Sequence, residues 1–138
     1  MPTFKSIEEA RARFQDDRFA VENGITIDAL GERSAECSFA IADRHRNARG
    51  SVMGGAIFTL ADFACAVAAN NVHYPTVTQQ VSVSFLSGAR GSRLIARARC
   101  RKDGRTTCVY NVDVTDDLGQ DVAQVVITGF KLPPLSGC

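Results

Sequence analysis

Several features that would assign a chain to a class at once are missing from these 138 residues. No cysteine pair shows the C-x-x-C spacing typical of zinc sites, and an odd number of cysteines argues against a disulfide framework. The formal net charge is only +1, so the chain has no general attraction to nucleic acid or acidic membranes. No apolar run of signal-peptide length occurs in MPTFKSIEEARARF. We expect a cytoplasmic globular protein, without metal, nucleic-acid partner or membrane partner, and with five reduced thiols: Cys37, Cys65, Cys100, Cys108 and Cys138.

The composition that is present, 45% hydrophobic and 22% charged, is typical of a globular domain. No internal repeat, linker or low-complexity tract divides the sequence. A chain of this length buries roughly 68–70% of the surface that its unfolded form exposes. It therefore does not need disulfide bonds or a bound metal in order to fold. We therefore expect one domain over residues 1–138.

The pattern of apolar residues predicts an α+β fold. A capping box in SIEE predicts a short N-terminal helix over residues 6–14. Residues 24–30 and 34–42 are predicted to form a hairpin, with Ile25, Ile27 and Ala29 on one face of its first strand.

A long apolar helix over residues 54–70 follows a polar loop, and four further strands follow the helix. Gly- and Asp-containing turns, SGARGS, KDGR and DDLGQ, separate these strands. The order ββαββββ predicts a curved antiparallel sheet of about six strands wrapped around one central helix and covering it on all sides. The strands are expected at residues 77–86, 93–101, 106–115 and 122–131.

One acid interrupts the apolar helix GSVMGGAIFTLADFACAVAAN, namely Asp62. An aspartate in such a helix is unfavourable by propensity and by desolvation unless a partner compensates it. In the simplest interpretation, Asp62 reaches a solvent-exposed edge or hydrogen-bonds a neighbouring hydroxyl. The same helix, however, begins at Gly54 and Gly55, where unpaired N–H groups and the positive end of the helix dipole stabilise an oxyanion. A carboxylate and an oxyanion donor together are the smallest set of groups that can catalyse acyl transfer.

The spacing of these two groups adds a structural prediction. Gly54 and Asp62 are separated by roughly 12 Å along the helix axis, at ~1.5 Å per residue. Both groups of one helix cannot contact the same acyl carbon. If both are catalytic, the donor and the acid come from different subunits of a symmetric dimer.

The motif N-x-x-G-x-x-x-G-G-x-x-x-x-L-x-D, followed by VSVSFLSGARGSRLIARA and DGRT, resembles the PaaI-like (phenylacetate-pathway type) acyl-CoA thioesterases of the hotdog-fold superfamily. The resemblance covers about residues 24–132 and implies a hotdog fold, a homodimer or dimer of dimers, and hydrolysis of acyl-CoA to acid and free CoA. It implies that Asp62 is the general base or the nucleophile. It also implies that the Gly54 N–H and the Asn47 side chain hold the thioester oxygen from the opposite subunit, and that Thr78 orients the water or the carboxylate.

The sequence departs from the family at Met53, where the family commonly has histidine. Methionine cannot donate a hydrogen bond, so any help from that histidine is missing, although the backbone donor after it does not depend on this side chain.

Binding residues for the substrate are expected in two groups. The phosphates of CoA need cationic partners, and turn residues reach a ligand better than the strand arginines Arg93, Arg97, Arg99 and Arg101, which also fit a solvated sheet face. The CoA-binding residues are therefore expected to be Arg90, Lys102, Gly104 and Arg105. The acyl pocket is expected to be lined by Met53, Gly55, Phe58, Phe63 and Phe85.

Alternative functions use other residues. A non-catalytic acyl-CoA binding protein would have no need of a desolvated Asp62. A hotdog hydratase would use Asp43 and His45 in the loop before the helix, but the surrounding pattern does not match. Cys65 fits a core position better than a nucleophile, and two isolated histidines, His45 and His73, do not indicate a metal. No metal or redox cofactor is expected.

Overall fold

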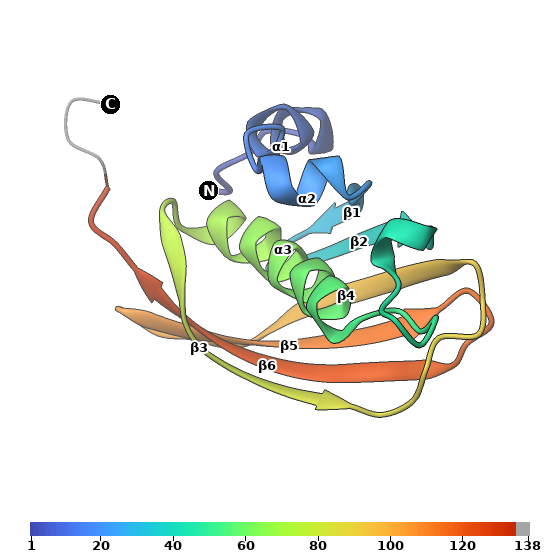
Figure 1. Cartoon of the computed structure of the whole chain (residues 1–138). Helices are drawn as coiled ribbons and strands as arrows, with labels where there is room; N and C mark the ends of the chain where they lie inside the picture. Colours follow the sequence, from blue (N-terminus) through green and yellow to red (C-terminus); the bar gives the residue numbers. More distant parts are fainter. Residues whose placement is uncertain (135–138) are drawn as a thin grey trace.

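In the computed structural model, which describes residues 1–134, a six-stranded antiparallel sheet curls around one long helix (Figure 1). The strands lie in the order β1-β2-β4-β5-β6-β3, so β1 and β3 form the two edges. The strands are β1 (Thr26–Gly31), β2 (Ser34–Ala40), β3 (Thr76–Phe85), β4 (Arg93–Asp103), β5 (Thr107–Asp116) and β6 (Asp121–Lys131). The helices are α1 (Ile7–Phe14), α2 (Arg18–Glu22), the 3-10 turn η1 (Asp43–His45) and α3 (Gly54–Val72).

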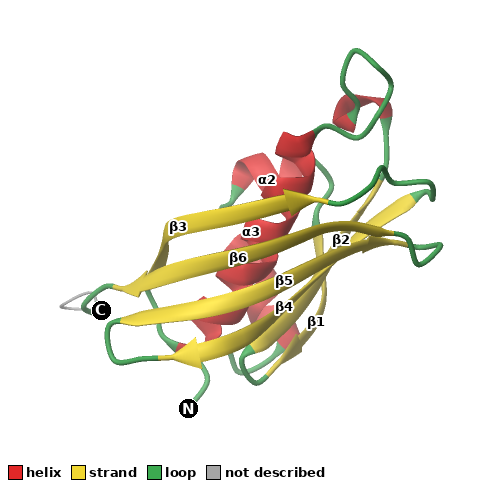
Figure 2. Cartoon of the chain, turned by 90° about the horizontal axis from the view of Figure 1, so that it is seen from below, coloured by secondary structure: helices red, strands yellow, loops and turns green. Residues whose placement is uncertain are grey.

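The predicted order of elements is confirmed, and each of the four later strands begins and ends within two residues of its predicted bounds. The agreement arises because Gly- and Asp-containing turns mark the ends of these strands in the sequence. Figure 2 shows β3 at one edge of the sheet and α3 lying across its concave face. This is the α+β architecture that the resemblance implies.

The N-terminal helix α1 is also confirmed. Its cap is Ser6, whose Oγ accepts a hydrogen bond of 3.2 Å from the N–H of Glu9. The five-residue helix α2 was not predicted, because RFAVE is too short to show a helical period. Together, α1 and α2 lie on the side of α3 that faces away from the sheet (Figure 1).

The prediction that Ala29 shares the buried face of β1 is wrong. The pairing of β1 with β2 shifts register between Ile27 and Ala29, so Asp28 is the extra residue of a β-bulge. A bulge reverses the alternation of faces beyond it. Ile27 is therefore buried while Ala29 is exposed, and the partly buried Leu30 packs against the core instead.

The helix α3 forms the centre of the core. By length and composition alone it is apolar enough to cross a membrane, but most of it is buried inside this fold. The expectation that the sheet covers it on all sides is wrong, because one stripe remains open. Between Ile57 and Asn71 the positions that are not buried are Phe58, Thr59, Asp62 and Ala66.

Four cysteines are unpaired in the structure, and Cys138 lies outside the described residues. Within residues 1–134, no group of three or more His, Cys, Asp or Glu side chains is arranged to hold a metal ion.

Candidate functional site

The open stripe of α3 faces the edge strand β3, and this is where Asp62 finds its partner. The Thr78 hydroxyl donates a hydrogen bond of 2.9 Å to Asp62 Oδ1. A β-bulge at Gln79, next to Thr78, locally bends β3. The sequence motif therefore identified two residues, 16 positions apart, whose side chains are in direct contact.

The environment of Asp62 changes its acidity. Burial raises the pKa of Asp62 above the ordinary value for aspartate, while the Thr78 hydrogen bond lowers it in part. A carboxylate with a raised pKa is a stronger base than an exposed one. This arrangement fits a group that takes up a proton during catalysis.

A second carboxylate near Asp62 was not predicted from the sequence. Asp17 occupies the N-cap position of α2, but its side chain makes no capping hydrogen bond. Burial raises the pKa of Asp17, and the negative charge of Asp62 raises it further. No signal in the sequence could have indicated this neighbour, because α2 itself was not predicted.

At the start of α3, unpaired backbone N–H donors lie beside the aromatic ring of Phe85. The N–H groups of Gly54 and Gly55 find no acceptor among residues 1–134, as expected for the first turn of a helix. The ring of Phe85, at the end of β3, lies so close to Gly54 that a Cβ added there would be 3.0 Å from Phe85 Cζ. The Met53 methyl group lies near Gly55, where an added Cβ would be 3.5 Å away. Phe85 and Met53 are both exposed, at 57% and 44%.

The predicted polar helper, Asn47, lies in the loop before α3. Its Oδ1 accepts hydrogen bonds from the N–H groups of Arg49 (3.0 Å) and Ser51 (3.1 Å). This pair of bonds assigns the amide orientation, because only the oxygen can accept. The Asn47 Nδ2 group therefore points away from its own loop and has no acceptor among the residues that the structure describes.

The loop is anchored by His45, which is 1% exposed. Its Nδ1 accepts a hydrogen bond from the Ala42 N–H (2.9 Å), so Nε2 carries the proton and donates to the Asn23 carbonyl (2.8 Å). The imidazole also stacks on Phe39, with ring centroids 4.1 Å apart. The His45 carbonyl accepts from the Met53 N–H, which fixes the residue before the helix.

The predicted pocket residues divide between two environments. Met53, Gly55, Phe58 and Phe85 lie at the start of α3 or along its open stripe. Phe63 is 5% exposed, and its ring packs edge-to-face on Phe14 of α1, with centroids 5.5 Å apart. A cavity of about 440 Å³ lies at the opposite end of α3, near Val72, and does not include Asp62 or Gly54.

The predicted CoA-binding residues are not brought together within one chain. Arg90 lies in the loop before β4, while Lys102, Gly104 and Arg105 lie where β4 ends and the turn to β5 begins. An eleven-residue strand separates the two groups by roughly 35 Å.

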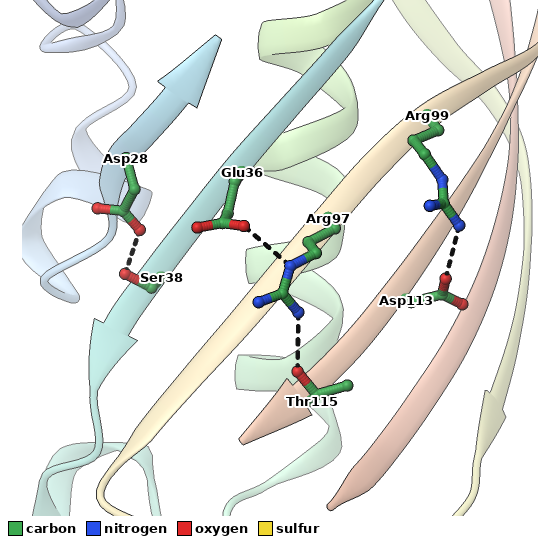
Figure 3. A network of polar contacts seen from close by, with 7 residues as sticks. All are labelled: Asp28, Glu36, Ser38, Arg97, Arg99, Asp113 and Thr115. Carbon is green, nitrogen blue, oxygen red and sulfur yellow. Dashed lines mark hydrogen bonds and ion pairs between the residues drawn. The ribbon is translucent and has the colours of Figure 1, made fainter. Parts of the chain in front are cut away.

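Two of the strand arginines, Arg97 and Arg99, belong to a solvated face of the sheet. On the face away from α3, Arg97 Nε donates to Glu36 at 2.9 Å, and Arg99 pairs with Asp113 at 3.2 Å (Figure 3). These ion pairs give the two arginines carboxylate partners from their own chain, which favours the solvated-face interpretation.

Comparison with known proteins shows the family. A family model described as the thioesterase superfamily matches residues 49–123. The acyl-coenzyme A thioesterase PaaI of Escherichia coli K12 is 31% identical over 120 residues, covering 86% of each chain. The structure of E. coli PaaI matches with a TM-score of 0.86 at 27% identity, over 91% of this chain and 92% of that one.

Two further structures contain bound CoA compounds. The smu.793 protein of Streptococcus mutans UA159, solved with acetyl CoA, is 30% identical, with a TM-score of 0.74 over 78% of this chain and 87% of that one. A hypothetical thioesterase from Streptococcus pneumoniae TIGR4, solved with coenzyme A, is 26% identical, with a TM-score of 0.78 over 85% of this chain and 94% of that one. Sequence and fold together therefore place this chain in the thioesterase superfamily, as a PaaI-like thioester hydrolase with the hotdog fold.

Proposed function

We propose that this protein hydrolyses acyl-CoA thioesters, using the Asp62 carboxylate as the general base or the nucleophile. The observation that carries the proposal is the position of Asp62. Its half-buried carboxylate is hydrogen-bonded to Thr78 on the open stripe of an otherwise buried helix. The activity named for E. coli PaaI and the CoA compounds bound to two relatives support the substrate class.

The reaction needs an oxyanion donor that the same helix cannot bring to Asp62. The helix α3 runs without a break from Gly54 to Val72, so Gly54 stays roughly 12 Å along its axis from Asp62. A second copy of the chain solves this problem, and the edge strand β3 is the element that would bring it.

The strand β3 is ten residues long and mostly exposed, and it has an unpaired edge. Such an edge is a template for pairing with another strand. A two-fold axis crossing β3 near Ser82 would place Phe85 of one copy opposite the bulge at Thr78 and Gln79 of the other. Phe85 lies on Gly54, and Thr78 contacts Asp62, so the same axis brings a second copy's Gly54 beside Asp62.

In this dimer the thioester carbonyl oxygen would accept hydrogen bonds from the Gly54 N–H and from Asn47 Nδ2 of one copy. Asp62 of the other copy would remove a proton from water as the water attacks the carbonyl carbon, and the CoA thiolate would leave with its electron pair. Direct attack by Asp62 would instead form an anhydride, which water then hydrolyses to the acid. Both routes give one carboxylic acid and one free CoA per thioester, without a metal or redox cofactor.

The hydratase alternative is not favoured by the site. It requires His45 to exchange a proton with substrate, but both ring nitrogens of this buried side chain are bonded to backbone groups.

A non-catalytic acyl-CoA binding protein remains the rival. It would use the same pocket, but it gives no reason for a desolvated Asp62.

The first test compares wild type with Asp62→Asn on acetyl, hexanoyl, lauroyl, benzoyl and phenylacetyl thioesters of CoA. The readout is loss of thioester absorbance, because the protein's own thiols would react with a thiol reagent. Removing the base should lower the rate by about 10²-fold or more. Asp113→Asn is the matched control, since it removes an exposed carboxylate on the other face of the sheet. An inactive wild type, or an unchanged Asp62→Asn rate, would favour the binding protein.

A second test asks whether two chains share one site. Gly54→Pro removes the proposed N–H donor at the first helical position, where proline is well tolerated. Each mixed dimer of Asp62→Asn and Gly54→Pro chains would contain one intact site. Random mixing should therefore restore about a quarter of the wild-type rate. A site built within one chain would stay inactive in every mixture.

A further inference from the structure

The turn between β4 and β5 is held by a salt bridge that the catalytic proposal does not use. Lys131, the last residue of β6, donates from Nζ to Asp103 Oδ1 at 2.5 Å and to the Gly104 carbonyl at 2.7 Å. The two side chains of the ion pair are only 13% and 14% exposed. A pair so well shielded from water is screened less than a surface ion pair.

The other oxygen of the same carboxylate is also engaged. Arg33, in the β1–β2 turn, approaches Asp103 Oδ2 at 3.4 Å, and its side chain is 52% exposed. The Asp103 carboxylate therefore contacts one cation from β6, Lys131, and one from the β1–β2 turn, Arg33. Its sequence neighbours Lys102 and Arg105 are exposed and form no ion pair within the described residues.

The backbone of the turn is equally constrained. The Gly104 N–H donates to the Thr107 carbonyl at 2.8 Å, and the Lys131 N–H donates to the Thr106 carbonyl at 2.8 Å. A Cβ added at Gly104 would lie 2.8 Å from the Thr107 carbonyl oxygen, so the turn leaves no room for a side chain there. Lys131 thus contacts the turn through both its side chain and its backbone.

The charges of this region favour an anion. Residues 32–33, 101–105 and 131 contain five cations, Arg33, Arg101, Lys102, Arg105 and Lys131, and two carboxylates, Glu32 and Asp103. A free Asp103 carboxylate between Lys102 and Arg105 would attract both of them and repel a phosphate. Lys131 draws that carboxylate inward and neutralises it.

The position of the turn also suits the phosphates of CoA. Thr78, the partner of Asp62, pairs with Gly129 in β6, and Lys131 lies two residues further, about 7 Å along the strand. The turn extends beyond Lys131. The pantetheine arm separates the thioester of CoA from its phosphates, so a phosphate site must lie at a distance from the reacting carbon.

We infer that Lys131 is a positioning residue, which neutralises Asp103 and fixes the β4–β5 turn so that Lys102, Arg105 and Arg33 are presented to the phosphates of the substrate. This inference rests on the proposed acyl-CoA hydrolysis. Lys131 itself does not touch the acyl group or the reacting carbon. Its loss should weaken binding of the phosphate-bearing part of the substrate and leave the chemical step unchanged.

The test compares the same acyl group carried by CoA and by pantetheine, which lacks the nucleotide and its 3′-phosphate. Lys131→Met keeps the length of the apolar stem but removes the charge. We expect its KM for acyl-CoA to rise about tenfold, its kcat to stay within about twofold, and kcat/KM for acyl-pantetheine to remain unchanged. Arg33→Gln, at an exposed side chain, should show the same selectivity in a smaller degree.

Two further variants separate positioning from stability. Lys131→Arg should restore most of the affinity for acyl-CoA because it keeps a cation at Asp103. Arg18→Met removes an exposed cation, which pairs with Glu22 at 2.6 Å, and should change neither substrate's kinetics.

The outcomes distinguish failure of the positioning role from failure of the proposed function. The positioning role is overturned if Lys131→Met lowers kcat/KM equally for acyl-CoA and acyl-pantetheine, or if it changes neither value. In both cases the proposed function stands. If Lys131→Met does not fold, Arg33→Gln and Lys131→Arg decide the question by the same ratio of acyl-CoA to acyl-pantetheine kinetics. A wild-type protein that hydrolyses neither thioester overturns the proposed function and this inference with it.

Discussion

Thr78 and Asp62 join the edge strand β3 to the core helix α3 through one hydrogen bond of 2.9 Å from the Thr78 hydroxyl to Asp62 Oδ1. That bond lowers the pKa of Asp62, against the larger effect of burial, which raises it. Thr78→Val removes the bond and keeps the shape of the side chain. The pKa of Asp62 should rise, and the acidic limb of the kcat/KM profile should move to higher pH.

The same variant should lower kcat by about tenfold, because Asp62 also loses the group that orients it. Thr78→Ser is the control, since it keeps a hydroxyl at the same place and should restore both the rate and the position of the acidic limb. If the valine variant retained the wild-type profile, Thr78 would have no part in setting the acidity of Asp62.

The buried charge of Asp62 should cost the fold stability at neutral pH. Its folded-state pKa lies above the ordinary value of 3.8, so the ionised form is less favourable in the folded state than in the unfolded state. This destabilisation is fully present above the folded-state pKa, decreases as the pH falls through that pKa, and disappears below the unfolded-state value. Asp62→Asn should therefore be more stable than wild type near neutral pH, and the difference should vanish towards about pH 4.

Urea unfolding of both proteins at the two pH values, at a fixed protein concentration, measures this difference in the free energy of unfolding. Asp113→Asn is again the control, because its exposed carboxylate has little desolvation to relieve. A wild-type protein that is more stable than Asp62→Asn near neutral pH would show that Asp62 serves the fold.

The close approach of Phe85 to Gly54 predicts a separation of activity from stability. A Cβ on Gly54 would lie 3.0 Å from Phe85 Cζ, so Gly54→Ala must shift the ring slightly away from the helix start. Alanine is favoured over glycine in a helix by up to about 1 kcal/mol, so the variant should not lose stability. Its kcat/KM should nevertheless fall by about tenfold or more, since misplaced groups at an oxyanion site are costly.

The double variant Gly54→Ala/Phe85→Leu tests the cause of that loss. The smaller side chain leaves space for the added methyl group, so part of the lost activity should return. Thermal unfolding of the three variants should run alongside the kinetics. A Gly54→Ala protein with wild-type kcat/KM would show that the ring position over the helix start is unimportant for turnover.

The sequence could reveal the residues of this site but only part of their arrangement. Asp62 was conspicuous because an acid in an apolar helix needs a partner, and the family motif pointed to Thr78. Asp17 could not be found, because the five-residue helix that carries it has no detectable period. The β-bulge at Asp28 also had no signal, and it reversed the face of Ala29.

The open stripe beside Asp62 depends on where the sheet ends, which is a tertiary property. A strand at the edge and a strand in the middle of this sheet have similar sequences, since both alternate apolar and polar residues. The sequence also predicted one CoA-binding group that joins Arg90 to Lys102 and Arg105. The length of β4 instead holds Arg90 roughly 35 Å from the other two residues. Spacing along the chain predicted the helix geometry well because a helix has a fixed rise per residue.

Substitution of His45, in the loop before α3, distinguishes a structural role for this residue from a role as catalytic acid or base. Its two ring nitrogens bond the Ala42 N–H and the Asn23 carbonyl, at 2.9 and 2.8 Å, and the side chain is buried. His45→Leu should leave both backbone groups without a partner, which costs about 2–4 kcal/mol of stability. The neighbour Asp43 is exposed, so Asp43→Asn should match wild type in both stability and thioester hydrolysis.

A hydratase would give the opposite pattern, because Asp43 and His45 would both be required to add water across a carbon–carbon double bond. Wild type should therefore leave the double bond of an enoyl-CoA intact while it hydrolyses the thioester, and Asp43→Asn should behave identically. Following the loss of the enoyl absorbance separately from the thioester absorbance distinguishes the two reactions. Hydration that disappears in Asp43→Asn would move the chemistry from Asp62 to this loop, and His45 would then have to leave its two backbone partners during turnover.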